Sequence, residues 1–466
     1  MKRAAIFVTI FSLSLALRMR GPATIGPYDE AYHWKRIAYS ARHFPRVLAF
    51  DPDREAWCPW PPLYDVTMAA IAHVIPSGAR DLGGGRYVSA PHPPGSLAPL
   101  GMTCVLWVPP IAFSLFAAIV GVTYGWVAGA GIALAPYLIG VSSIAKIDHH
   151  WTEPMFVVAM LALRRRPIAL GVVMAAALFV QPALIIACGL LFFVCDRSNA
   201  RSFALAALAV IVYRMSSAYP DNGWFLGWPH AALLAAAAVA LILKPRWYAI
   251  PIGAAVALPW LPQIAAGMHF LRGDPWLQSI VEFQPLFHDW SRVGTDLANV
   301  SGGVVALVIF ARKRSPALLL FSIAYLALAL SSQRFLVPAM AVFALAGATA
   351  AIERPVLAAL LTLLPPLCYD LYALTHPQPA FDPVTPIAQR IAALPPGRVL
   401  APWYMGHAID VIGHHAVVID NFGTMPDSTR FELANEALDN PRIVRAYCRM
   451  NHVRYVVMHG AIWTME

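Results

Sequence analysis

Long apolar runs separated by short polar segments dominate the chain between residues 4 and 375. A membrane-spanning helix needs about 20 mostly apolar residues, and the pattern predicts about thirteen such helices. The predicted helices are centred near residues 11, 108, 132, 157, 175, 188, 208, 236, 256, 305, 323, 343 and 364. No small-residue cleavage site follows the first run, residues 4–17, so we expect a retained helix, with a signal peptide as the alternative.

The basic residues between these runs indicate on which side of the membrane each connection lies. If the amino terminus is cytoplasmic, every second connection is also cytoplasmic. Nearly all of these connections carry arginine or lysine, as the positive-inside rule requires. These residues are Arg197, Arg201, Lys244, Arg246, Arg354 and the clusters at 164–166 and 312–314. The opposite face receives the polar segments 21–99, 146–153, 216–228, 266–298 and 331–334, and the tail from residue 375. We therefore expect the chemistry on the extracytoplasmic face.

After residue 375 the sequence becomes richer in proline and charge. Runs typical of short strands occur at residues 398–401, 416–419 and 455–458, and residues 429–435 are typical of a helix. The pattern predicts a small extracytoplasmic α/β domain at 376–466 and a transmembrane domain at 1–375, with outer loops at 21–99 and 266–298. The expected fold class is therefore mostly α: a polytopic membrane protein with a small C-terminal α/β domain.

The composition agrees with a membrane protein and excludes a soluble globular one. Of the 466 residues, 59% are hydrophobic and 13% are charged, and the mean hydropathy is +0.60. The net charge of +9 comes largely from short clusters between apolar runs, so we expect no nucleic-acid partner. The six cysteines lack metal-binding spacing and are expected to be buried apolar residues, with a Cys58–Cys448 disulfide as the alternative on an oxidising face.

The strongest chemical signal is the stretch 148–153, which places two acids and two histidines between apolar runs. Charged side chains are costly at the centre of a bilayer, so such a cluster is expected at a membrane surface or in a cavity, where it usually serves function. Asp29 follows the first helix and falls on the same face. Asp29, Asp148 and His150 together suit Mg²⁺ or Mn²⁺. An interfacial cap of solvated charges is the alternative.

Two further charged residues are expected on this face. Glu282 lies among apolar residues in the outer loop 266–298, which indicates a loop that packs onto another element and a partly dry carboxylate. Arg334 ends a helix on the outer side, where arginine is disfavoured, and a bound phosphate would explain it. The alternatives are that Glu282 is simply solvated and that Arg334 forms a structural ion pair.

In their order along the chain, these segments resemble the catalytic-subunit family of oligosaccharyltransferases, membrane glycosyltransferases of the GT-C class. The resemblance runs over most of the chain. The similar segments are Asp29 with Tyr32, His33 and Arg36; Asp51-Pro52; Trp60 to Asp65; Asp-His-His-x-x-Glu at 148–153; Ser279 to Glu282; and Arg334-Phe335. Each match is weak alone, but the ordered set is specific.

The resemblance implies a membrane-lipid donor in which a glycan is linked through diphosphate to a polyprenol. A cation held by Asp29, Asp148 and His150 would neutralise the departing diphosphate, and Arg334 would bind a phosphate oxygen. Asp29 and Glu282 would hydrogen-bond the amide of the acceptor protein or peptide and orient its nitrogen.

Three more residues are implied to support these ligands. His149, Glu153 and His33 would orient them, because metal ligands normally need hydrogen-bonded partners. The expected location is the plasma membrane of a prokaryote.

One match to the family is defective. The Trp-Trp-Asp-Tyr-Gly motif, which holds the hydroxyl of an Asn-x-Ser/Thr acceptor, corresponds to residues 402–406, with Trp403, Tyr404 and Gly406 as the implied acceptor-binding residues. Tyr404 stands where the family has aspartate, and a hydroxyl is a weaker acceptor than a carboxylate.

This difference leaves a second prediction open: a GT-C transferase acting on a lipid, a polysaccharide or another protein site. A transporter is the third, although acids at helix ends on one face disfavour it.

Overall fold

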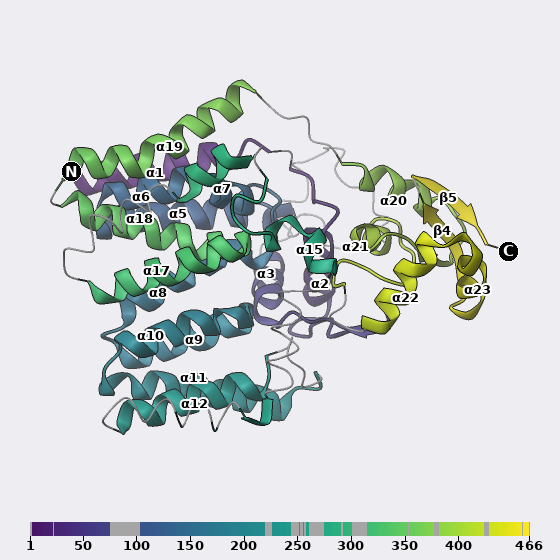
Figure 1. Ribbon diagram of the computed structural model, residues 1–466, viewed down its shortest axis with the longest axis horizontal. Coiled ribbons are helices and arrows are strands. Elements are labelled where there is room, and N and C mark those ends of the chain that lie inside the picture. The colour runs from purple at the N-terminus through teal and green to yellow at the C-terminus, as the bar shows by residue number, and fades with distance from the viewer. Residues whose placement is uncertain are drawn as a thin grey trace. The chain divides into compact units, whose positions relative to one another are not determined.

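The computed structural model describes residues 2–21, 23–74, 103–219, 226–243, 251, 255, 258–260, 275–289, 292–300, 315–352, 354–376, 382–423, 428–458 and 460–465 (Figure 1). The chain forms two compact units, each assembled from separate stretches. The helical unit comprises Met1–Gly21, Pro109–Ile144 and His149–Gln378, and the mixed unit comprises Pro22–Val108, Ala145–Asp148 and Pro379–Glu466. The predicted division into domains at residue 376 stays a prediction.

The described part of the helical unit consists of α-helices and short 3₁₀ helices. Its α-helices are α1 (Lys2–Arg18), α5 (Val108–Tyr124), α6 (Trp126–Leu134), α7 (Pro136–Ser142), α8 (Glu153–Leu163), α9 (Pro167–Val180), α10 (Ile185–Val194), α11 (Ala200–Ser216), α12 (Trp228–Ile242), α15 (Pro275–Ser279), α17 (Pro316–Ser331), α18 (Leu336–Ala351) and α19 (Pro355–Thr375). Its 3₁₀ helices are η2 (His149–Thr152), η3 (Pro182–Leu184), η4 (Arg197–Asn199), η6 (Leu258–Trp260), η7 (Val281–Phe283) and η9 (Gln333–Phe335).

Helices lie at most of the positions where the apolar runs predicted them. In the described part of the chain, three helices are long and apolar enough to cross a membrane: Thr103–Tyr124, Gln333–Ala351 and Pro355–Thr375. Shorter apolar helices are Pro167–Val180, Pro182–Val194, Trp228–Ile242 and Pro316–Ser331. The runs centred near 256 and 305 lie largely outside the described residues. The mostly helical prediction is confirmed, and the larger number of spans stays a prediction.

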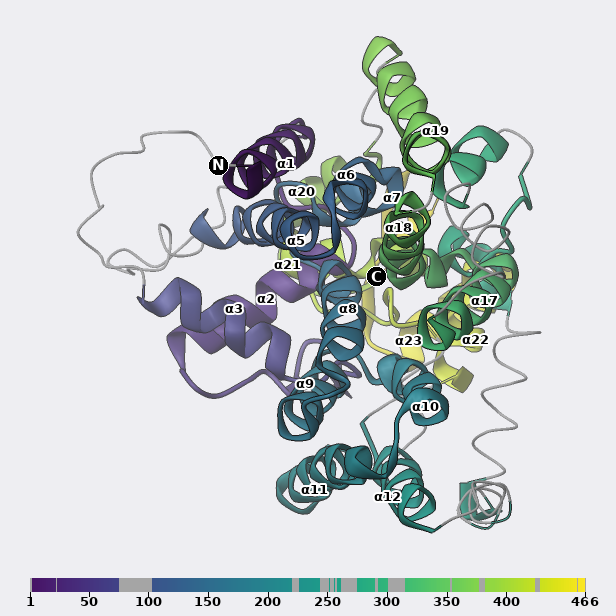
Figure 2. The same ribbon diagram turned by 90° about the vertical axis from the view of Figure 1, so that its left-hand side faces the viewer.

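Helix α18 is the packing centre of the helical unit, with nearly all of its residues buried. It contacts α6, α8, α17 and α19, which surround it in Figure 2. Small residues allow this close approach: a Cβ on Gly347 would lie 2.4 Å from the hydroxyl of Thr362 in α19, and one on Gly131 would lie 3.1 Å from Ala344. Small residues at helix crossings are the usual means of association in membranes, where lipid provides no hydrophobic drive.

The mixed unit combines helices with two small sheets. Its elements are α2 (Asp29–Arg42), β1 (Phe50–Asp51), β2 (Ala56–Trp57), α3 (Leu63–Val74), α20 (Val384–Ala392), β3 (Arg398–Leu400), η10 (Trp403–Met405), α21 (Gly406–Val411), α22 (Ser428–Asp439), α23 (Pro441–Met450), β4 (Val453–Met458) and β5 (Ala461–Thr464). Strands β1 and β2 pair antiparallel. In the second sheet the order is β3-β4-β5, with β3 and β4 parallel and β4 and β5 antiparallel.

The C-terminal residues form their own hydrophobic core. It is built from Val384, Ile387, Ala388, Ile391, Val399, Ala401, Met405, Ala408, Ile409, Val417, Tyr455 and Val457. The strands predicted at 398–401 and 455–458 and the helix predicted at 429–435 are confirmed. Residues 416–419 contribute only a bridge between Val417 and Val399, so this prediction of a strand is wrong. The segment lies along the free edge of β3, where the Val399 amide donates to the carbonyl of Ala416 at 2.8 Å and the Val418 amide donates to the carbonyl of Val399 at 3.0 Å, but the pairing extends no further than this bridge.

The cysteines behave as the apolar interpretation predicts in four of six cases. All six are free, so the alternative Cys58–Cys448 disulfide does not form. Cys58, Cys188, Cys195 and Cys448 are buried, whereas Cys104 is half-buried and Cys368 is exposed.

Gly406 opens α21 where this helix passes the backbone of Asp420. We expect Gly406→Ala to destabilise the protein by about 1–3 kcal/mol, the usual cost of overpacking, because an added Cβ would lie 2.3 Å from the Cα of Asp420. Thermal unfolding in detergent measures the effect. Gly140→Ala in α7 is the control, since its Cβ would meet nothing within 4 Å. Equal midpoints for the two variants would contradict this account.

Candidate functional site

In the helical unit, the second half of the 148–153 motif contacts Arg334. Proline at position 154 favours the first turn of α8, so Glu153 begins that helix while His150 lies in η2. The guanidinium of Arg334, from η9, donates to Glu153 Oε1 at 2.6 Å and lies 2.8 Å from His150 Nδ1. Glu153 is only 4% exposed. Two motifs about 180 residues apart therefore meet in one buried ion pair.

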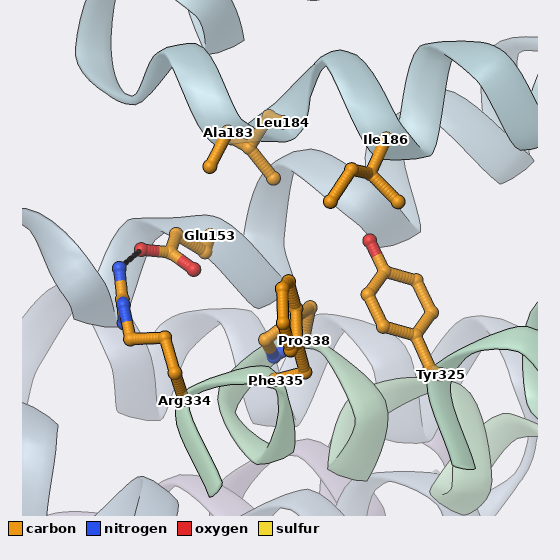
Figure 3. A pocket seen from close by; sticks show the side chains of 8 residues that line it. All are labelled: Glu153, Ala183, Leu184, Ile186, Tyr325, Arg334, Phe335 and Pro338. Atoms are coloured by element: carbon orange, nitrogen blue, oxygen red, sulfur yellow. Dashed lines mark hydrogen bonds and ion pairs between the residues drawn. The ribbon is translucent and has the colours of Figure 1, made fainter. Parts of the chain in front are cut away.

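A pocket opens beside this ion pair. It is lined by Glu153, Ala183, Leu184, Ile186, Tyr325, Arg334, Phe335 and Pro338. Figure 3 shows Arg334 facing Glu153 at one end, Tyr325 at the other, and the apolar side chains between and above them. The pocket is thus charged at one end, carries the Tyr325 phenol at the other and is lined by apolar side chains between them.

His149, His150 and Glu153 offer three possible metal-ligand atoms within 4.8 Å of one another. However, the Arg334 guanidinium already contacts His150 Nδ1 and Glu153 Oε1. A cation at this point would face that positive charge, so we interpret the cluster as an ion pair that holds Arg334. His149 is buried, and its Nε2 lies 3.1 Å from the amide nitrogen of Gln181.

The loop that carries Glu282 packs against the element that carries Arg334. The backbone N–H of Gln333 donates to the backbone carbonyl of Gln284 at 2.9 Å, and the Ser332 hydroxyl donates to the backbone carbonyl of Glu282 at 3.2 Å. Glu282 lies in η7 and is half-buried. These backbone contacts fix η7 beside η9, as the apolar neighbours of Glu282 indicate.

In the mixed unit, the first half of the motif contacts α2. Asp148 is the last residue of the stretch Ala145–Asp148, which is held by a hydrogen bond from the Tyr64 hydroxyl to the Ile147 carbonyl at 2.6 Å and by an ion pair between Lys146 and Glu30. His33 Nε2 lies 3.5 Å from Asp148 Oδ1. The His33 ring stacks on Trp60, with 4.0 Å between ring centroids.

A chain of buried charges fixes the orientation of His33. Its Nδ1 lies 2.6 Å from Asp65 Oδ1, and the other oxygen of Asp65 lies 2.5 Å from a guanidinium nitrogen of Arg36. Burial alone would lower the pKa of His33, but the carboxylates of Asp65 and Asp148 outweigh burial and raise the pKa to about 9. His33 is therefore a cation at neutral pH, and its Nε2–H points at Asp148.

The charge on His33 predicts a pH-dependent stability. A folded-state pKa of about 9, above the ordinary 6.5, means that His33 stabilises the fold fully below pH 6.5 and loses this contribution as pH rises through 9. The shift corresponds to about 3 kcal/mol. The gap in unfolding midpoint between wild type and His33→Gln should therefore be widest below pH 6.5 and narrow above pH 9.

The control for this pH series is His43→Gln, which changes an exposed histidine at the end of the same helix. Its midpoint should follow wild type at every pH. A gap between wild type and His33→Gln that stays constant across the series would show that His33 is not charged in the folded state.

Helix α21 is fastened to α2 by a second set of charges. Lys35 lies 2.8 Å from Asp410 of α21 and 2.9 Å from both Asp51 and Asp53. Burial would lower the pKa of Lys35, but Asp410 and Asp51 outweigh it and raise the pKa. Next to this set, Arg54 pairs with the buried Asp420. These contacts join the segment that follows α1 to the C-terminal core within one unit.

Residues 402–406, the motif expected to contact an acceptor, lie at this junction. Trp403 is half-buried, whereas Tyr404 is 37% exposed, and the two rings meet edge to face at 5.8 Å. Gly406 begins α21, and the next residue, His407, is fully buried with its Nε2 3.7 Å from Asp29 Oδ1. Burial lowers the pKa of His407 to about 3. Asp29 itself begins α2 and keeps 37% of its side chain exposed.

Comparison with known proteins identifies this architecture. No protein-family model and no curated protein matches the chain. The crystal structure of the apo Archaeoglobus fulgidus oligosaccharyltransferase matches 98% of this chain and 69% of its own, with a TM-score of 0.72 and 15% identity. The chain has the fold of an oligosaccharyltransferase. A structure of the same archaeal protein in complex with zinc and sulfate matches 97% of this chain and 67% of its own, with a TM-score of 0.64 and 17% identity.

The oligosaccharyltransferase fold agrees with the resemblance seen in the motifs, and the structure shows how the predicted residues are distributed. Arg334, His150 and Glu153 meet in the helical unit, and His33 meets Asp148 in the mixed unit. The predicted cation ligands Asp29, Asp148 and His150 belong to both units, since the unit boundary falls between residues 148 and 149. Their common role therefore stays a prediction.

Sequence reasoning missed several residues of this oligosaccharyltransferase fold. Asp65 was noted only as the end of the segment from Trp60, although it holds His33. His407 directly follows residues 402–406, and this position is the one feature of the sequence that could have pointed to it. Nothing in the spacing of Lys35 and Asp410 indicates that they pair, because 375 residues separate them.

Proposed function

We propose that this chain is a metal-dependent oligosaccharyltransferase, which transfers a glycan from a polyprenyl-diphosphate donor to an asparagine of an acceptor protein. The observation that carries the proposal is the convergence of distant motifs within each unit: Arg334 with His150 and Glu153, and His33 with Asp148. The oligosaccharyltransferase fold, which extends over 98% of the chain, supports it.

The proposed setting is the extracytoplasmic face of a prokaryotic plasma membrane. About thirteen helices in the GT-C arrangement would span that membrane. The alternation of basic connections with other polar connections supports this orientation. The donor would be a membrane lipid, and its polyprenol would lie among the helices.

The mixed unit would contribute two carboxylates to a site for a hard divalent cation such as Mn²⁺ or Mg²⁺. Asp29 and Asp148 offer carboxylate oxygens, which these ions prefer. His33 orients the Asp148 carboxylate, as partners of metal ligands normally do. His150 belongs to the other unit and its Nδ1 contacts Arg334, so only its other ring nitrogen would serve this cation, and that assignment rests on the sequence motif. The archaeal protein was crystallised with zinc and sulfate, which supports a divalent cation and a phosphate-like anion as ligands here. A bound cation would offset the negative charge of the departing diphosphate.

The remaining roles fall to side chains of this chain. Arg334, oriented by Glu153, would bind a donor phosphate oxygen with its planar guanidinium. The carboxylates of Asp29 and Glu282 would accept hydrogen bonds from the acceptor amide and turn its nitrogen towards the anomeric carbon. Trp403, Tyr404 and Gly406 would contact the acceptor.

An in vitro transfer assay tests the proposal. Purified protein is given Mn²⁺, a polyprenyl-diphosphate glycan and one of two peptides, which differ only in Asn-x-Thr against Asn-x-Ala. Glycosylation of the threonine peptide alone, lost with a chelator and in Glu282→Gln, is the expected result. Absence of metal-dependent turnover with every donor tested would refute it.

A second candidate keeps the chemistry and changes the acceptor to a lipid, a polysaccharide or a protein site without a sequon hydroxyl. Tyr404 is the observation that favours it, because an exposed tyrosine stands where the family has a carboxylate. If this second candidate is correct, we expect the same assay to show release of diphosphate from the donor with neither peptide glycosylated.

A further inference from the structure

His407 is a buried histidine whose ring nitrogens contribute to no hydrogen bond among the described residues. Its ring is enclosed by three aromatic side chains. It stacks on Tyr32 at 4.8 Å and meets the edges of Phe422 at 4.7 Å and of Trp60 at 6.4 Å. The side chain is 0% exposed, and its Nε2 lies 3.7 Å from Asp29 Oδ1.

This arrangement is costly unless something else completes it. A buried polar nitrogen without a hydrogen bond costs about 1–3 kcal/mol, and such groups are rare in native proteins. The separation of 3.7 Å from Asp29 is too long for a hydrogen bond. The three rings restrict the imidazole, so Nε2 is held facing the carboxylate. A phenylalanine would keep an aromatic ring at this position without the polar cost.

We propose that His407 is a ligand of the same divalent cation that Asp29 holds. The inference rests on the proposed function, which makes Asp29 a cation ligand. A nitrogen and an oxygen 3.7 Å apart can both lie about 2.1 Å from one ion, the usual length of metal–nitrogen and metal–oxygen bonds. Asp29 remains partly exposed, so a cation can reach its oxygen.

The packing of α21 on α2 determines the distance between the two ligands. Asp29 and Lys35 lie on α2, and His407 and Asp410 lie on α21. Lys35 pairs with Asp410 at 2.8 Å, which ties the two helices together beside the Asp29–His407 pair. The C-terminal segment would thus supply a metal ligand as well as an acceptor surface.

The proposal predicts a change in metal selectivity, which a packing role for His407 would not produce. Imidazole is a good ligand for Zn²⁺ and for first-row transition metals, whereas Mg²⁺ prefers oxygen. Loss of His407 should therefore weaken binding of Mn²⁺ and Zn²⁺ more than binding of Mg²⁺.

The experiment measures binding of Mn²⁺, Zn²⁺ and Mg²⁺ to the purified full-length chain, stripped with a chelator, in wild type and in His407→Phe. Phenylalanine keeps the ring stack and removes both nitrogens. We expect the Mn²⁺ and Zn²⁺ dissociation constants to rise about tenfold or more, with little change for Mg²⁺. The metal-free variant should remain folded, because removal of an unpaired polar atom offsets the cost of the larger ring, and its unfolding midpoint checks this.

The matched control is His415→Phe, which changes another buried histidine of the same unit. His415 contacts the carbonyl oxygens of Gly413 and Pro395, so this variant should lose stability and keep its metal affinity. If His407→Phe does not fold, His407→Gln gives the same measurement with a polar side chain of similar reach, and its Mn²⁺ and Zn²⁺ affinities should fall below those of wild type.

The outcomes separate this inference from the proposed function. Wild-type affinity for Mn²⁺ and Zn²⁺ in the folded His407→Phe variant would overturn the inference and leave the proposed function intact. A wild-type protein that binds none of the three cations would overturn the metal-dependent function, and the inference with it.

Discussion

Asp29→Asn is expected to lower glycan transfer by about three orders of magnitude while the protein remains folded. The amide keeps the shape of the side chain but loses the charge that holds a cation and the acceptor's N–H groups. Loss of one electrostatic stabiliser commonly costs about 10²–10³ in rate, and weaker metal binding adds to that loss. The transfer assay under saturating donor, together with the unfolding midpoint, measures both parts.

The matched control for this variant is Asp53→Asn. Asp53 is a neighbouring acid of the same unit, is largely exposed and contacts Lys35. Its loss should change transfer by less than about threefold, because exposed ion pairs contribute little. Equal loss of transfer in the two variants would mean that general negative charge, and not the position of Asp29, matters.

Breaking the Arg334–Glu153 pair from one side is expected to destabilise the protein strongly. Arg334→Gln leaves the Glu153 carboxylate buried without its guanidinium partner, and such a change costs about 3–5 kcal/mol. The unfolding midpoint should fall sharply. The double variant Arg334→Gln with Glu153→Gln removes both charges, so its midpoint should return close to that of wild type.

Transfer should not return with stability in the double variant. If Arg334 binds a donor phosphate, both variants lose this contact, and we expect about a 10²-fold lower transfer in each. Recovery of stability and transfer together would reduce Arg334 to a structural ion-pair partner. That result would refute the proposed binding of a donor phosphate by Arg334. The described contact between Arg334 and Glu153 would stand.

The periodicity of the sequence predicted the helical architecture well because hydropathy is a local property. Runs such as that near residue 364 became helices, here α19, since an apolar segment of this length has few other stable forms in lipid. Local pattern also predicted β3 and β4. It failed at residues 416–419, where partner strands far along the chain decide whether pairing completes.

The candidate site was predicted only as far as motifs reveal it. Arg334 and Glu153 are each noticeable in the sequence. Arg334 is an arginine expected on the outer side of the membrane, where arginine is disfavoured, and Glu153 is an acid immediately before an apolar run. The contacts of His33 with Asp65 and of Lys35 with Asp410 depend on burial and on distant partners. Neither burial nor a distant partner can be recognised from the spacing of residues along the chain. His407 likewise resembles any other histidine until its enclosure by aromatic rings is seen.

The ties between α2 and α21 have a consequence for how such a protein can be recombined. Because Lys35 binds Asp410 and Tyr32 stacks on His407, the last ninety or so residues share their interior with the loop that follows the first helix. A chimera that exchanges the tail alone between homologous chains would leave α2 facing a foreign surface. The interchangeable segment is therefore discontinuous: Pro22–Val108, Ala145–Asp148 and Pro379–Glu466 must be inherited together.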